Sequence, residues 1–136
     1  MTQDLSFEIR LPIPYEEAVE KVVAALKNQG FGVLTRIDVK ATLKEKIDID
    51  FRPYVILGAC NPPLAHKALS TDARVGLMLP CNVTVEDDPH GSSIIRIANP
   101  KTMIMVGELA EVPGLNEVTD MVYSRLERVA HFLEQK

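Results

Sequence analysis

Residues 81–98 read CNVTVEDDPHGSSIIRIA, the pattern of two strands joined by a turn. In the first half, Val83 and Val85 share one face and polar residues alternate with them, as the two-residue repeat of a strand requires. The turn formers at 87–91 predict a five-residue loop, after which residues 93–98 return as a strand. Because the two strands of a hairpin run antiparallel, this stretch argues against a purely parallel α/β sheet.

The periodicity outside the hairpin alternates between strand and helix. Further extended segments are predicted at 5–11, 31–37, 53–59 and 75–79. Helices are predicted where an apolar stripe repeats at helical spacing or where a capping residue precedes a turn, at 14–29, 38–46, 61–69, 101–106 and from about 116 onward. The resulting order is β-α-β-(α)-β-α-β-β-(α)-α. It predicts an α+β two-layer sandwich, with a mostly antiparallel sheet and helices on one face, as a single domain over residues 1–136.

The composition excludes several classes of function. The 136 residues carry 15 Lys and Arg against 19 Asp and Glu, a formal charge of −4, so no basic excess favours nucleic acid as a partner. The apolar runs are far shorter than the roughly 20 residues that span a membrane, so we expect no membrane association. The first residues lack the basic start and apolar stretch of a secretory signal, and we expect a cytoplasmic location.

Candidate chemistry concentrates where the predicted strand 53–59 ends and a helix begins. There the sequence reads Cys60-Asn61-Pro62, with Asn61 as the expected helix cap and a thiol directly before it. Unpaired amides at a helix N-terminus stabilise a thiolate and can receive an anion. The second thiol, Cys81, is followed by Asn82 at the start of a strand, so the two cysteines can approach each other if their strands are neighbours.

Each candidate has a purely structural alternative. A free cysteine is often an inert small hydrophobic residue, so one interpretation places Cys60 and Cys81 in the core. The other two interpretations are a shared metal or ligand site and a pair of reactive thiols. Arg52 lies in a lysine-rich segment that could recruit an anionic ligand, but interleaved carboxylates favour an ordinary mixed surface. Met103 and Met105 predict core or dimer packing, with a flexible contact surface as the alternative.

Three blocks of the sequence carry a resemblance to a known family. They are Gly30–Asp38 with Thr42–Lys46, Phe51–Pro62 and Leu79–Val83. Together they resemble the domain-of-unknown-function 302 family of small bacterial and archaeal proteins. The resemblance implies a two-layer α+β fold related to the TATA-binding-protein-like fold, often dimeric, and no established activity. Family members have Gly-Asn-Pro or a similar triplet at 60–62, which favours a structural role for Asn61.

Three functional hypotheses follow from the sequence. The first is a non-enzymatic homodimer that binds a small ligand or soft metal ion near Cys60 and Cys81, with Asn61, Asn82 and Arg52 as further candidate contacts. The second is a cysteine-dependent enzyme or redox protein that uses Cys60, for which the sequence supplies no identifiable base. The third is a structural or assembly dimer. The sequence specifies neither the ligand nor the metal nor any cofactor.

Overall fold

The protein forms a five-stranded sheet in which every neighbouring pair of strands is antiparallel. A computed structural model describes residues 4–135. The spatial order of the strands is β1-β5-β4-β3-β2. Their bounds are β1 Ser6–Leu11, β2 Gly32–Asp38, β3 Tyr54–Cys60, β4 Cys81–Asp88 and β5 Ser92–Ala98. The α+β class, the strand order along the chain and the antiparallel hairpin predicted from the sequence are confirmed.

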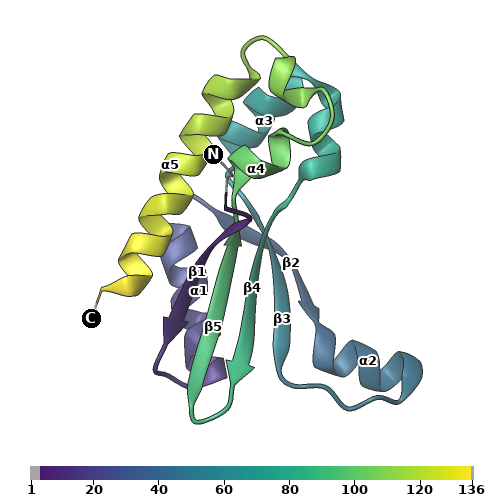
Figure 1. Ribbon diagram of the computed structural model, residues 1–136, viewed down its shortest axis with the longest axis vertical. Helices are drawn as coiled ribbons and strands as arrows, with labels where there is room; N and C mark the ends of the chain where they lie inside the picture. The colour runs from purple at the N-terminus through teal and green to yellow at the C-terminus, as the bar shows by residue number, and fades with distance from the viewer. Residues whose placement is uncertain (1–3, 136) are drawn as a thin grey trace.

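Two long helices cover one face of the sheet, as the sequence predicted. They are α1, Tyr15–Asn28, and α5, Leu115–Glu134, and they pack against each other and against the strands. The remaining helical elements are α2 Val39–Ile47, α3 Pro62–Thr71, α4 Pro100–Ile104 and the short 3₁₀ helices η1 Ala73–Met78 and η2 Leu109–Glu111. Figure 1 shows α3 and α4 gathered with the start of α5 at one end of the sheet, and α2 extending away at the other end.

Local capping chemistry sets the helix boundaries. Gly30, at a φ of +85°, lets Phe31 N–H donate to Leu26 O at 2.9 Å, which ends α1 in a left-handed turn. Asn61 accepts from Leu64 N–H at 3.3 Å and begins α3, while Asn99 accepts from Lys101 N–H at 2.9 Å and begins α4. Prolines follow both asparagines in the first helical turn, where the missing donor costs nothing.

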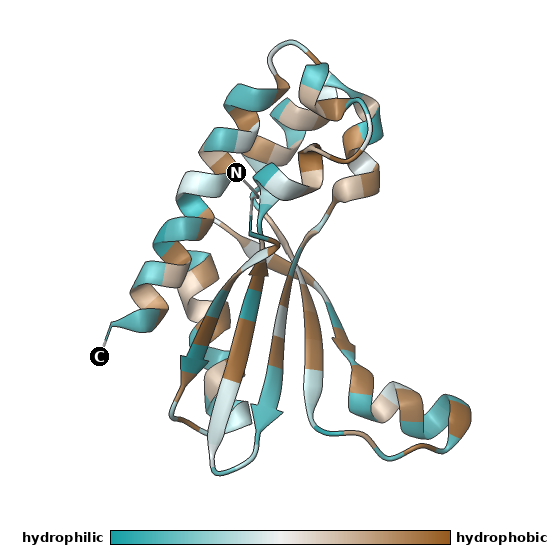
Figure 2. Cartoon of the chain, viewed as in Figure 1, coloured by the Kyte–Doolittle hydropathy of each residue, from teal (hydrophilic) through white to brown (hydrophobic). Residues whose placement is uncertain are grey.

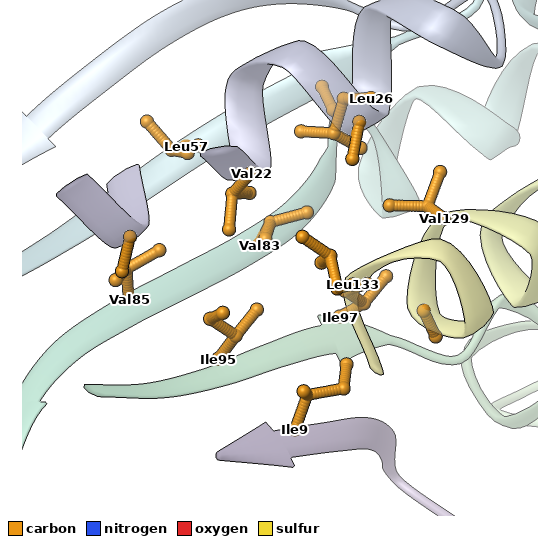
Figure 3. Close-up of a cluster of buried hydrophobic side chains, with 14 of the residues drawn as sticks. Ile9, Val22, Leu26, Leu57, Val83, Val85, Ile95, Ile97, Val129 and Leu133 are labelled. Atoms are coloured by element: carbon orange, nitrogen blue, oxygen red, sulfur yellow. The ribbon is translucent and has the colours of Figure 1, made fainter. Parts of the chain in front are cut away.

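The main core lies between the sheet and the pair α1 and α5. Figure 3 shows its side chains pointing toward one another from the strands and from both helices. Its strand members alternate along each strand, so the opposite face of the sheet carries the intervening residues. Fully buried members include Val22, Leu57, Val83, Ile95, Ile97 and Leu126. We call the sheet face away from α1 and α5 the open face.

A second, smaller core lies at the end of the sheet where α3, η1, α4, η2 and the start of α5 meet. Its buried members are Ala68, Val75, Ile104, Leu109, Leu115 and Val118. Met78, Leu79 and Val112 pack against them while remaining partly exposed. This end of the molecule is therefore built from short helical pieces held by apolar contacts, in contrast to the regular sheet beside it.

Two local predictions are wrong. Residues 75–79 are not extended, because 73–78 form the 3₁₀ helix η1, whose start is capped when Asp72 accepts from Arg74 N–H at 2.9 Å. The hairpin loop is also shorter than five residues, since the pairing of Asp88 with Ser92 leaves only 89–91 between the strands. His90 and Gly91 take positive φ angles there, and Ser92 Oγ donates to Asp88 at 2.8 Å.

Among residues 4–135, the structure contains no helix with the length and apolar character needed to cross a membrane. The residues 1–3, on which the expectation about a secretory signal depends, lie outside the described residues.

Candidate functional site

A cavity of about 140 Å³ lies between the end of the sheet and the smaller core; we call it the end cavity. Its walls come from α3, η1, the start of β4, the end of β5, α4, η2 and α5. The lining is mostly aliphatic and includes three sulfur-bearing side chains, Met78, Cys81 and Met103.

Cys81 reaches the end cavity because β4 begins there. It pairs with Ala59 of β3, which is buried in the main core, so its side chain leaves the sheet on the same inner face. Cys81 packs against that core. Burial, with a smaller contribution from the charge of a Cys60 thiolate, raises the pKa of the Cys81 thiol to about 11. The thiol is therefore protonated at neutral pH and is a poor nucleophile.

Cys60 and Cys81 lie on neighbouring strands but do not face each other. Because Ala59 is the partner of Cys81, Cys60 follows at the next position and points to the open face, opposite the exposed Gly32. Both cysteines are free and partly exposed. Cys60 does not line the end cavity. Over residues 4–135, no three His, Cys, Asp or Glu side chains gather into a metal-binding group.

Asn61 is buried, and its amide links the start of α3 to the end of α1. Its Oδ1 accepts from Leu64 N–H in α3, and its Nδ2 donates to the carbonyl of Gln29 at the end of α1 at 3.5 Å. Arg125 of α5 donates to the same carbonyl at 3.2 Å. Both polar atoms of the Asn61 side chain are thus engaged within the protein, as the structural alternative for this residue predicted.

Arg52 lies at the opposite end of β3 from Cys60, separated by a strand about 20 Å long. Its Nε donates to Glu86 at 2.7 Å, and its guanidinium stacks on the Phe51 ring at 4.5 Å from the ring centroid. Glu86 also accepts from Arg96. Burial alone would raise the pKa of Glu86, but hydrogen bonds from Arg96 and Arg52 outweigh it and lower this pKa. Glu86 is therefore ionised at neutral pH and already pairs with Arg52. This pairing agrees with an ordinary surface of mixed charge at Arg52, the alternative to an anion-binding site.

Of the five residues proposed from the sequence, the structure brings only Cys81 and Asn82 to the end cavity. Asn82 is exposed, so it lies at the mouth. Sequence reasoning missed the contribution of Met78, because residues 75–79 were expected to be extended. The sequence pattern indicated that Met103 is a packing residue or part of a contact surface. Met103 lies two residues from the exposed Met105, and this spacing does not indicate a cavity.

Nearly the whole chain matches the model of one protein family. The model of the family described as "Domain of unknown function DUF302" matches residues 7–133. The chain belongs to the DUF302 family. This confirms the resemblance seen in the blocks 30–46, 51–62 and 79–83. The comparison with curated proteins gave no match.

A solved DUF302 structure agrees with the fold described above. The crystal structure of an uncharacterized conserved DUF302 protein from Bacillus stearothermophilus aligns with a TM-score of 0.82 and 29% sequence identity. The alignment covers 95% of this chain and 98% of that chain. The two proteins therefore share the α+β architecture over nearly their whole lengths.

Proposed function

We propose that this DUF302 protein is a non-enzymatic binding module whose end cavity holds a small uncharged ligand. The observation that carries the proposal is an aliphatic hollow of about 140 Å³ beside the end of the sheet. An enclosed cavity of about 150 Å³ with aliphatic and aromatic walls binds benzene, so a hollow of this size and lining can hold a molecule of that size. Drug-sized ligands need 300 Å³ or more, so this cavity selects for much smaller occupants.

The charges of the lining support an uncharged occupant. In the part of the chain that the structure describes, Cys81 is the only ionisable side chain in the walls, and burial holds its pKa at about 11. A charged ligand would leave water without a compensating charge, at a cost of several kcal/mol. Asn82 at the mouth and Thr119 in the wall offer polar groups that can orient a ligand.

Benzene is a suitable probe, because it has the volume and polarity that the end cavity selects. We expect benzene to raise the melting temperature of the protein and to shift backbone amide NMR signals of the smaller core. Ala68→Leu, which fills the cavity from α3, should abolish both effects. Ala24→Leu, at an exposed position of α1, is the matched control and should leave both unchanged.

The proposal is wrong if benzene shifts no signal of the smaller core, or if Ala68→Leu binds benzene as the wild type does. Circular dichroism and the urea midpoint of each variant show whether the fold is retained, so loss of binding is not mistaken for unfolding.

A second observation supports an assembly role through a homodimer. Residues 34–49, which we call the arm, contain four exposed aliphatic side chains, namely Leu34, Ile37, Ile47 and Ile49. Helix α2 has no buried residue, and Figure 2 shows its hydrophobic positions on the segment that extends from the sheet. Exposed apolar surface of this kind marks an interaction site.

We propose that the occupant of the arm is a second copy of this chain. The arm, residues 34–49, contains four Lys and Arg residues and three carboxylates, so its net charge of +1 is too small to select a partner of one sign. Such a surface is compatible with the self-complementary contact that a two-fold dimer requires.

Sedimentation velocity tests this assembly. At tens of micromolar, the wild type should sediment as a dimer, and Leu34→Glu with Ile47→Glu should sediment as a monomer. Leu77→Glu, at an 85% exposed position in η1 outside the arm, should remain dimeric. A monomeric wild type, or a dimer that survives both arm substitutions, would rule out this interface.

A further inference from the structure

We propose that the end cavity is a binding site for Cu(I), with Sγ of Cys81 and the thioether sulfurs of Met78 and Met103 as ligands. This inference rests on the proposed function, because it names the chemical class of an occupant for the same cavity. It also replaces the pair Cys60 and Cys81 as the sulfur site, since those two side chains leave opposite faces of the sheet.

Three separate elements bring these sulfurs to one cavity. Met78 ends η1, Cys81 begins β4, and Met103 lies in α4, yet all three side chains line the same hollow of about 140 Å³. Only Cys81 in this group belongs to the residue types His, Cys, Asp and Glu, because the other two members are thioethers. Methionine has three rotatable bonds, so its sulfur can adjust to the position of an ion.

The ligand type selects the metal. Thiolate and thioether sulfurs are soft donors and favour Cu(I), whereas Mg²⁺, Ca²⁺ and Mn²⁺ prefer oxygen. Structural Zn²⁺ takes four ligands from Cys, His and carboxylates. Within residues 4–135, the walls of the end cavity offer only one residue of those types, Cys81.

The charge balance of the site also favours Cu(I). When Cys81 binds the ion, its thiol proton leaves to solvent and the thiolate contributes one negative charge. A monovalent Cu(I) then forms a complex with zero net charge, and its oxidation state does not change. A divalent ion would leave one uncompensated positive charge among aliphatic walls, which is costly. The occupant therefore meets the same requirement as an uncharged organic ligand.

A competition titration measures the affinity. Cu(I) is added anaerobically to the whole protein in the presence of bicinchoninate as the competing chelator. We expect one Cu(I) per chain. Loss of a group that only supports a metal ligand typically costs about 10- to 100-fold in affinity, so loss of a direct ligand should cost at least as much. Cys81→Ser should therefore weaken binding at least about 100-fold, and Met78→Leu or Met103→Leu at least about tenfold each. Leucine keeps the volume of methionine, so the fold should be retained.

Matched controls separate this site from sulfur elsewhere. Met105→Leu, at a 61% exposed position two residues from Met103, should bind Cu(I) as the wild type does, and so should Cys60→Ser. Equal losses in Cys60→Ser and Cys81→Ser, or wild-type affinity in Met78→Leu combined with Met103→Leu, would overturn the proposal.

The benzene experiment distinguishes this proposal from the one on which it rests. If the protein binds benzene and no Cu(I), the metal assignment is wrong and the end cavity keeps its proposed function. If neither probe binds, both proposals fail. If Cu(I) binds and the Met→Leu variants bind it more weakly while still binding benzene as the wild type does, the sulfur atoms are assigned as metal ligands.

Discussion

Ile95→Ala should lower the free energy of unfolding by about 2–5 kcal/mol, whereas Ile94→Ala should lower it by about 1 kcal/mol. The two isoleucines are adjacent in β5, but Ile95 is fully buried in the main core and Ile94 is partly exposed on the open face. Truncating Ile95 removes its transfer free energy and leaves a cavity among packed neighbours. At Ile94 water already reaches the side chain, so truncation loses less.

Urea denaturation followed by circular dichroism measures both changes, with similar m-values showing that the comparison is two-state. Because a one-residue shift in register exchanges the two faces of a strand, the pair also tests the pairing of β5 with β4 and β1. Equal destabilisation by the two substitutions would mean that Ile94 is as well covered as Ile95, contrary to the burial of the two side chains in the structure.

Signals carried by neighbouring residues predicted most of the fold correctly. Asn61-Pro62 and Asn99-Pro100 each combine a capping side chain with a proline that needs no donor, and both begin helices as expected. Gly30 takes the positive φ that a left-handed helix end requires. Such signals depend on contacts between residues a few positions apart, so they are independent of the rest of the structure.

The error at 75–79 has a physical cause. A short apolar run bounded by turn residues does not distinguish a strand from a buried helical turn. Here Asp72 decides the outcome, because its carboxylate accepts from Arg74 N–H and binds the Arg74 guanidinium, which favours a tight helical turn. The segment joins none of the five strands of the sheet and instead buries Val75 in the smaller core.

The sulfur site required information that no local pattern carries. The sequence left open whether the strands of Cys60 and Cys81 are neighbours. The faces that the two cysteines take depend on the pairing of Ala59 with Cys81. A register shifted by one residue would have put both thiols on one face. Met78 and Met103 line the same cavity as Cys81 only because η1 and α4 both lie at this end of the sheet.

Gly58→Ala should destabilise the protein by about 1–3 kcal/mol and also weaken ligand binding in the end cavity. A Cβ atom at Gly58 would lie 2.2 Å from Oγ1 of Thr35 and 2.7 Å from Cγ of Pro80. Thr35 can rotate its side chain away, but the Pro80 ring is rigid and must move with the backbone. Pro80 lines the end cavity directly before Cys81, so its displacement changes the wall that holds the ligand.

Gly32→Ala is the matched control, because Gly32 also lies in a strand, has no positive φ, and a Cβ there would contact nothing within 4 Å. Its free energy of unfolding should stay the same or rise by up to about 1 kcal/mol through the lower entropy of the unfolded chain. In titrations with benzene and with Cu(I), Gly58→Ala should bind more weakly than the wild type, and Gly32→Ala should bind as the wild type does. Wild-type affinity in a destabilised Gly58→Ala would show that Thr35 absorbs the strain and that Pro80, and hence the cavity wall, stays in place.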